Sequence, residues 1–191
     1  SQYESSVRAH EATDMTMQDI ATALRRAEKV FERRPQIGLH DDASATARWQ
    51  GGTRVVSSHA NGTEVATDMP AELGGTGDHV TPGWLFRAGL ASCAATSIVM
   101  TAAAEEIELA SLEVFASSRS DTRALLGMSD ADGRLVPPGP SDLKLRVRIC
   151  AQGVEPARLR ALVEEGCRRS PIPNAVLNAV PMALHIDVGA A

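Results

Sequence analysis

The stretch that decides the fold is TPGWLFRAGLASC at residues 81–93, which opens a run of apolar and small residues that continues to about Glu106. Thr81 followed by Pro82 predicts the start of a helix, because a hydroxyl caps the first turn and proline suits its first position. The run is apolar or small on every face, and such a helix cannot face water on any side. We therefore expect a long buried central helix, covered on one side by a sheet and on the other by a second subunit.

Residues 83–104 of this run are also long enough to cross a bilayer, with Arg87 as the one charged residue. Alanine, serine, threonine and glycine dominate it, and these residues insert weakly compared with leucine, isoleucine or phenylalanine. We expect no signal peptide before it. We expect the buried helix of a soluble cytoplasmic protein with no membrane partner.

The residues before the helix predict three strands joined by tight turns. Extended patterns cover about 45–49, 53–58 and 63–69, separated by Gly51-Gly52 and by Asn61-Gly62. Asn-Gly between two extended runs is the strongest short hairpin pattern. The glycine-rich loop at 73–78 lacks the Lys-Ser/Thr of a phosphate loop, so it does not indicate a nucleotide site.

The residues after the helix predict more strands and another helix. A strand is expected from Leu112 towards Met128, and alternating residues predict another strand at 143–149. An amphipathic helix is expected at 155–169 and a last strand with Leu184, Ile186 and Val188 turned inward. This order predicts an α+β domain over residues 43–191, with mostly antiparallel sheet and one central helix.

Residues 1–42 form a predicted N-terminal extension with an amphipathic helix at about 14–34. Thr16 and Asp19 resemble a capping pair, and Pro35 ends the run. The apolar face of this helix consists of Met17, Ile20, Leu24, Ala27 and Phe31. The helix is either an arm that packs on the domain or a helix that binds a partner.

Composition excludes several classes of protein. The 191 residues carry a net charge of −5 and only 3% aromatic residues, whereas nucleic-acid binders usually present a basic face with aromatic platforms. The five histidines are scattered without HxxxH or HExxH spacing. We predict no nucleic-acid partner, no metal and no cofactor.

The three cysteines are Cys93, Cys150 and Cys167, an odd number without CxxC spacing. This pattern disfavours a secreted disulfide framework and a zinc site, and it fits a reducing cytosol. Cys150 falls on the polar face of its strand and receives no role, whereas Cys167 falls on the apolar stripe of its helix. Cys93 is either a small buried hydrophobe or a nucleophile. It lies too deep in its helix for the N-terminus to activate it, and Arg87 faces elsewhere, so an activator has to come from another segment.

Two segments resemble the OsmC/Ohr family. Residues 81–93 are similar to its Pro-Glu-x-Leu…Ala-x-x-x-x-Cys helix, and residues 166–176 are similar to its Cys-Pro-hydrophobic-Ser segment. The order of elements also matches over about residues 43–188. The resemblance implies an OsmC-like fold, an intertwined homodimer whose central helices pack together, and reduction of organic hydroperoxides through a thiolate.

The resemblance also implies roles for individual residues. Cys93 is the attacking thiol and becomes a sulfenic acid that a second thiol resolves. The activating arginine follows a Gly-Gly turn, which points to Arg54 and, as the fallback, to Arg48. The family's second cysteine is Ser170 here, so Cys167, one helical turn earlier, or an external thiol reductant has to resolve the intermediate.

A further departure from the family pattern is Gly83, which stands where the family has a glutamate that positions the arginine. Arg54 is therefore expected to lack its charge partner. Two hypotheses follow. The first is a thiol-dependent peroxidase for organic hydroperoxides, favoured by Cys93. The alternative is a non-catalytic homodimer that binds a hydrophobic small molecule, favoured by Gly83 and Ser170. Either ligand would occupy an apolar pocket predicted from Leu85, Phe86, Leu90, Ile172 and Val176.

Overall fold

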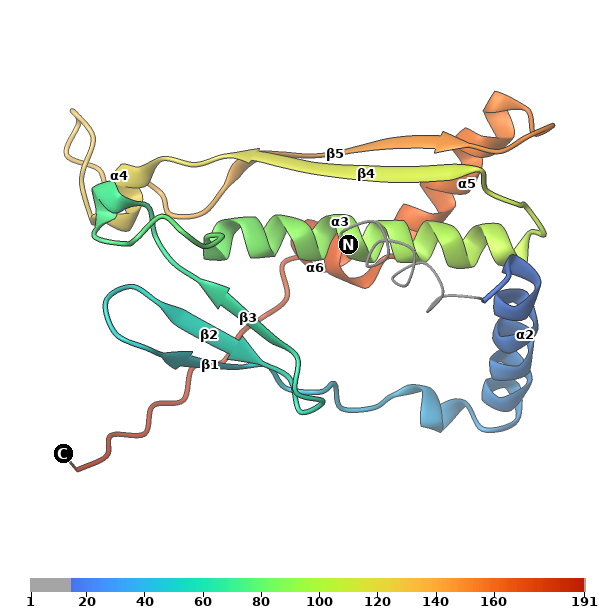
Figure 1. Ribbon diagram of the computed structural model, residues 1–191, viewed down its shortest axis with the longest axis horizontal. Helices are drawn as coiled ribbons and strands as arrows, with labels where there is room; N and C mark the ends of the chain where they lie inside the picture. The colour runs from blue at the N-terminus through green and yellow to red at the C-terminus, as the bar shows by residue number, and fades with distance from the viewer. Residues whose placement is uncertain (1–14, 191) are drawn as a thin grey trace, which may run out of the picture.

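The central helix lies between two antiparallel sheets in a computed structural model that describes residues 15–190 (Figure 1). The helices are α2 (Met17–Arg33), α3 (Pro82–Ala104), α4 (Thr122–Leu125), α5 (Pro156–Arg168) and α6 (Pro171–Leu177), with 3-10 turns η1 (Pro35–Gly38) and η2 (Ala71–Leu73). The strands are β1 (Thr46–Trp49), β2 (Val55–Ser58), β3 (Glu64–Thr67), β4 (Ser111–Arg119) and β5 (Ser141–Cys150). The predicted α+β class is confirmed.

The start of α3 is where the sequence predicts it. The Thr81 hydroxyl accepts a hydrogen bond from the Trp84 amide, and Pro82 occupies the first turn. The helix ends at Ala104, two residues before the predicted end, and Glu106 adopts a left-handed conformation with φ 57°. By length and composition α3 is apolar enough to cross a membrane, a test that core helices of soluble proteins also pass.

Within one chain α3 is covered on one side only. It packs against α2, β4, α5 and α6, and these contacts bury Leu90, Ala94, Ile98, Thr101, Ala102 and Ala103. Trp84, Phe86 and Met100 remain 48%, 38% and 42% exposed. The sequence predicted a helix that is buried on all sides. A single chain buries only part of the surface of α3.

The N-terminal sheet has the predicted hairpins. It has the order β1-β2-β3, with antiparallel pairing such as Ala47 opposite Ser57 and Val56 opposite Ala66. The turn between β1 and β2 uses Gly51 and Gly52 with φ 98° and 56°, a region open to glycine at little cost.

The second sheet pairs β4 with β5, and side chains on both strands alternate between half-buried and exposed. The predicted strand at 143–149 is confirmed. The prediction that β4 runs on towards Met128 is wrong, because the strand ends at Arg119. The Asp121 carboxylate accepts a hydrogen bond from the Arg123 amide and caps the short helix α4, which turns the chain away from the strand.

The predicted last strand at 184–188 is also wrong. Leu184, Ile186 and Val188 are 79%, 74% and 91% exposed, and the segment after α6 forms no ladder with any described strand (red in Figure 1). A strand needs a hydrogen-bonded neighbour, and residues 184–188 pair with none of the described strands.

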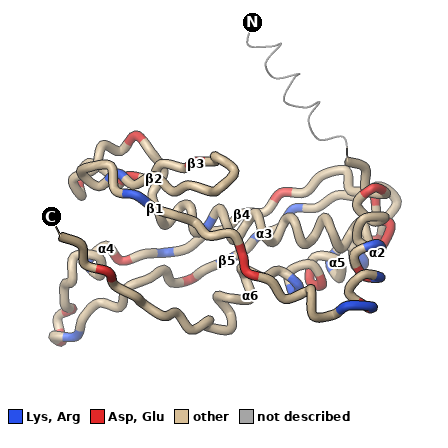
Figure 2. The backbone as a smooth tube through the Cα atoms, turned by 90° about the horizontal axis from the view of Figure 1, so that it is seen from below, with Lys and Arg blue, Asp and Glu red and all other residues tan. Residues whose placement is uncertain are grey.

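The N-terminal helix α2 has the predicted capping box between Thr16 and Asp19. It contacts the C-terminal part of α3, and Ala21 is buried there, as an arm that packs on the domain would be. Figure 2 shows α2 and α5 at the same end of the molecule, where they carry charged residues of both signs. Residues 1–14 of the predicted extension lie outside the described part of the chain.

We predict that Gly166→Ala weakens the packing of α5 on α3. A Cβ at Gly166 would lie 2.8 Å from the Cα of Ile98, so the two helices would have to separate. We expect the free energy of unfolding to fall by about 1–3 kcal/mol in urea denaturation.

The matched control is Gly83→Ala, where a Cβ would make ordinary contacts with the end of the Arg87 side chain at 3.6 Å and with the Thr81 hydroxyl at 3.9 Å. This change should be neutral or slightly stabilising, because alanine favours a helix over glycine. Equal stability of the Gly166→Ala protein and the unaltered chain would contradict the close-packing argument.

Candidate functional site

Cys93 lies near the middle of α3 and meets the segment that joins α5 to α6. Its Sγ accepts a hydrogen bond from the Ser170 hydroxyl at 3.1 Å and a longer one from the Ile172 amide at 3.5 Å. The cysteine is half-buried, whereas Ser170 is completely buried. The sulfur is therefore neither sealed among aliphatic side chains nor freely solvated.

The link between α5 and α6 is held in place by its own hydrogen bonds. Asn174 in α6 donates from Nδ2 to the carbonyl oxygens of Ser170 at 2.7 Å, Arg168 at 2.9 Å and Cys167 at 3.4 Å. Pro171 begins α6, and the Ser170 amide donates back to the Cys167 carbonyl at 3.1 Å. These bonds fix the Ser170 hydroxyl towards Cys93.

This arrangement can stabilise negative charge on the Cys93 sulfur. Hydrogen bonds to an ionised acceptor are about twice as strong as those between neutral groups, and the thiolate is the nucleophilic form of cysteine. The sequence predicted that an activator of Cys93, with Arg54 as the candidate, comes from another segment. The groups from another segment that hydrogen-bond to the sulfur are a serine hydroxyl and a backbone amide.

Arg54 belongs to a separate polar cluster that joins the N-terminal sheet to the loop before α3. Its Nη2 donates to Asp78 Oδ1 at 2.6 Å, to Thr76 Oγ1 at 3.0 Å and to Asp68 Oδ2 at 3.3 Å. The expectation that Arg54 lacks a charge partner because of Gly83 is therefore wrong. The hydrogen bond that the Arg54 guanidinium donates to the Asp78 carboxylate is the main cause that raises the pKa of Arg54.

Asp68 is the buried centre of this cluster. It accepts hydrogen bonds from the hydroxyls of Thr53 and Thr76, each at 2.6 Å, and these bonds hold the pKa of its carboxyl well below its usual range. The glycine-rich loop closes around it, because a Cβ at Gly75 would overlap the Met69 carbonyl oxygen. The loop thus encloses a carboxylate.

The remaining cysteines and the fallback arginine differ in burial, and none of them hydrogen-bonds to Cys93. Cys167 is a half-buried free thiol on α5, and burial raises its pKa. Cys150 is exposed, as expected, and the fallback Arg48 is exposed on β1. Neither Arg54 nor Arg48 hydrogen-bonds to Cys93, and no other arginine within residues 15–190 does so.

The predicted apolar pocket consists of residues from two helices in contact, α3 and α6. Leu90 is buried and Leu85 half-buried, whereas Phe86, Ile172 and Val176 are 38%, 45% and 41% exposed. Phe86 precedes Cys93 by two helical turns and shares its face. In one chain these residues form an open apolar surface beside the thiol.

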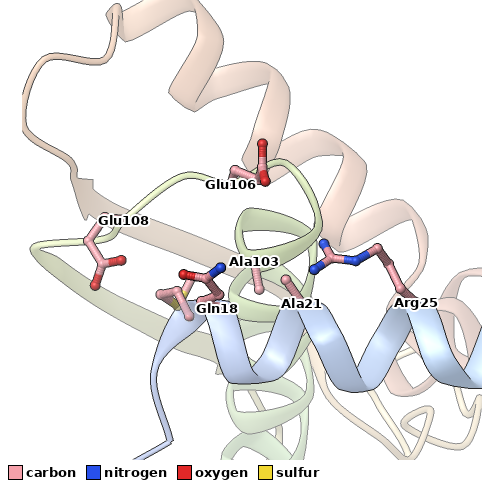
Figure 3. A pocket seen from close by; sticks show the side chains of 7 residues that line it. Gln18, Ala21, Arg25, Ala103, Glu106 and Glu108 are labelled. Atoms are coloured by element: carbon pink, nitrogen blue, oxygen red, sulfur yellow. The ribbon is translucent and has the colours of Figure 1, made fainter.

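A cavity of about 170 Å³ lies elsewhere, between α2 and the end of α3 (Figure 3). It is lined by Met17, Gln18, Ala21, Arg25, Ala103, Glu106 and Glu108. Ala103 is ten residues after Cys93, about 15 Å along the helix, so this cavity is distinct from the predicted pocket. Residues 15–190 contain no cluster of histidine, cysteine and acidic side chains that could hold a metal ion.

The fold and site define an α+β protein whose central helix presents a half-buried cysteine to a second helical segment. The chain belongs to the OsmC-like protein family, which matches residues 75–185, more than half of its length. This family includes organic hydroperoxide resistance proteins. No curated protein sequence matches the chain.

Solved structures confirm the fold. An OsmC-like protein from Mycoplasma pneumoniae superposes with a TM-score of 0.60 at 16% identity, covering 73% of this chain and 90% of that one. An organic hydroperoxide resistance protein from Elizabethkingia anophelis gives 0.55 at 23% identity, covering 73% and 91%. A putative osmotic stress induced and detoxification response protein from Psychrobacter arcticus gives 0.56 at 19% identity, covering 72% and 90%.

We predict that Asp68 makes the stability of the fold sensitive to acid. Because its carboxyl pKa is lower in the folded chain than in the unfolded one, its contribution is complete above about pH 4 and is lost as the pH falls below that value. In urea denaturation, the free energy of unfolding should fall less between pH 7 and pH 2 for Asp68→Asn than for the unaltered chain.

Thr53→Val keeps the Asp68 carboxylate and removes one of its donors. The fall in its free energy of unfolding between pH 7 and pH 2 should lie between those of Asp68→Asn and the unaltered chain. The Asp68→Asn protein should also be less stable at pH 7, since Arg54 and both threonines lose an ionised partner. If the free energy of unfolding falls equally at low pH in all three proteins, Asp68 is not a cause of the acid sensitivity.

Proposed function

We propose that this chain reduces organic hydroperoxides in a thiol-dependent reaction, with Cys93 as the attacking thiolate. The observation that carries the proposal is the pair of hydrogen bonds that Cys93 Sγ accepts from Ser170 and from the Ile172 amide. Membership of a family that includes organic hydroperoxide resistance proteins supports it.

The chemistry needs only a thiolate, a peroxide and a reductant. The Cys93 sulfur attacks one oxygen of the O–O bond, so that an S–O bond forms and the O–O bond breaks. The electron pair leaves with the second oxygen, which takes a proton from water and departs as an alcohol. Sulfur has lost two electrons and is now a sulfenic acid.

An organic hydroperoxide fits this site better than hydrogen peroxide. The surface beside the thiol is formed by Phe86, Ile172 and Val176, all of them apolar and partly exposed. An apolar substituent on the peroxide would cover this surface and gain free energy by leaving water.

We propose an external thiol as the reductant. It attacks the sulfenic sulfur, an S–S bond forms, and water leaves; a second thiol then releases Cys93 and forms a disulfide with the first. Ser170 stands beside the sulfur and cannot form a disulfide. Cys167 is the other candidate, but burial raises its pKa and so lowers its thiolate fraction.

We further propose that the working form is an intertwined homodimer. Phe86 and Met100 are exposed on the same side of α3, and the C-terminal tail exposes Leu184, Ile186 and Val188 in alternation. A second copy would cover both surfaces. Since Arg54 does not reach Cys93 in one chain, a contact between a guanidinium and the sulfur would have to come across this interface. Three free thiols are consistent with a cytoplasmic location.

The alternative function is a non-catalytic dimer that binds a hydrophobic small molecule. The exposed apolar surface at Phe86, Ile172 and Val176 favours it to the same extent as it favours an apolar peroxide. The two functions differ in whether Cys93 changes chemically.

We predict that Cys93→Ser reduces the consumption of cumene hydroperoxide to the background rate, because serine lacks a nucleophilic thiolate at neutral pH. Consumption is measured with a dithiol reductant in excess. Cys150→Ser and Cys167→Ser are the matched controls, and both should retain turnover. Full activity of Cys93→Ser, or loss of turnover in Cys167→Ser, would contradict the proposed roles.

We predict a dimer of about 40 kDa in analytical ultracentrifugation, twice the chain mass of 20.2 kDa. Ile186→Asp should shift the protein towards the monomer, because it places a charge in a surface that the second copy would cover. Asp187→Ala is the control, since alternate side chains of an extended segment point to opposite faces. A monomer of the unaltered chain would contradict the proposal.

A further inference from the structure

The buried hydroxyl of Ser170 makes one hydrogen bond among the described residues, and its partner is the reactive sulfur. Ser170 is 0% exposed, and its Oγ lies 3.1 Å from Cys93 Sγ. Buried hydroxyls in folded proteins normally have a partner, because an unpaired one loses its hydrogen bonds to water. Here that partner is a thiol or thiolate.

We propose that Ser170 is a further catalytic residue: its hydroxyl stabilises the Cys93 thiolate and then the sulfenic acid that follows, which keeps the oxidised centre open to an external thiol. The sulfenic acid step rests on the proposed function. The thiolate step does not, because it concerns the reduced protein alone.

The geometry gives Ser170 the larger share of this stabilisation. Pro171 has no N–H, and the Ser170 amide is already donated to the Cys167 carbonyl. The link between α5 and α6 therefore directs only the Ser170 hydroxyl and the Ile172 amide at the sulfur. The hydroxyl contact is shorter by 0.4 Å, from 3.1 and 3.5 Å.

A hydroxyl also suits each state of the sulfur. A neutral thiol can donate to the serine oxygen or accept from it, a thiolate can only accept, and a sulfenic oxygen can accept as well. The hydroxyl can rotate to satisfy each state without movement of the backbone. A cysteine at this position would instead attack the sulfenic sulfur and remove the intermediate.

The first test measures the reduced protein without peroxide. Alkylation of Cys93 by iodoacetamide is followed by peptide mass spectrometry across a range of pH for Ser170→Ala and the unaltered chain. We expect alkylation of Ser170→Ala at pH 7 to be about tenfold slower, since one donor to a charged acceptor is lost.

The matched control is Ser97→Ala. Ser97 is half-buried and lies four residues after Cys93 on the same face of α3, but its hydroxyl makes no hydrogen bond to the sulfur. Its alkylation profile should equal that of the unaltered chain. Equal profiles for Ser170→Ala and the unaltered chain, with both proteins folded in thermal unfolding, would overturn the inference.

The second test uses Ser170→Cys in a background with Cys150→Ser and Cys167→Ser. One equivalent of cumene hydroperoxide should convert this variant to a disulfide between Cys93 and the introduced thiol, with a mass loss of two hydrogens and release of water and alcohol. The same background with Ser170 intact should instead give a dimedone adduct of the Cys93 sulfenic acid. A dimedone adduct without disulfide in Ser170→Cys would overturn the inferred contact.

The two tests separate the inference from the proposed function. If the unaltered chain does not react with hydroperoxide but Ser170→Ala still slows alkylation, the peroxidase proposal fails and the role of Ser170 in holding the thiolate stands. If hydroperoxide reduction is fast and Ser170→Ala changes neither alkylation nor reduction, the inference about Ser170 fails and the peroxidase proposal stands.

Discussion

The close approach of α5 to α3 at Gly166 is the contact on which the site depends. A side chain there would come within 2.8 Å of the Ile98 backbone, so only glycine lets the two helices lie this close. Ser170 follows Gly166 by four residues, two residues after the end of α5. Any separation of the helices would therefore withdraw the Ser170 hydroxyl from Cys93, and the geometry of the thiol is a consequence of packing.

The uneven burial of α3 connects the site with assembly. One side of the helix packs within the chain and holds Leu90, Ala94 and Ile98 in the core, whereas Phe86 and Met100 stay exposed. Phe86, on the exposed side, also shares the face of Cys93. A second copy that covers this surface would turn the open apolar surface beside the thiol into an enclosed pocket, so the substrate site and the proposed interface are parts of one surface.

Patterns among neighbouring residues predicted most helices and strands. The features that depend on contacts between residues far apart in the sequence could not be predicted in this way. The cap at Thr81 and the turn at Asn61-Gly62 depend on neighbouring residues, and both are confirmed. The strand expected at 184–188 depends on a partner strand, which the sequence cannot supply. The contact between Cys93 and Ser170 spans 77 positions. The sequence marked Ser170 as a missing cysteine, but only the fold shows its hydroxyl at the sulfur.

The location of Arg54 determines which forces can act on Cys93. In its cluster one guanidinium faces the carboxylates of Asp68 and Asp78, so the cluster as a whole carries negative charge. Such a cluster gives a thiolate that it does not contact no net electrostatic stabilisation, because the field of the cation is cancelled by its partners. The stabilisation available within one chain therefore comes from neutral donors in direct contact with the sulfur, which are the Ser170 hydroxyl and the Ile172 amide.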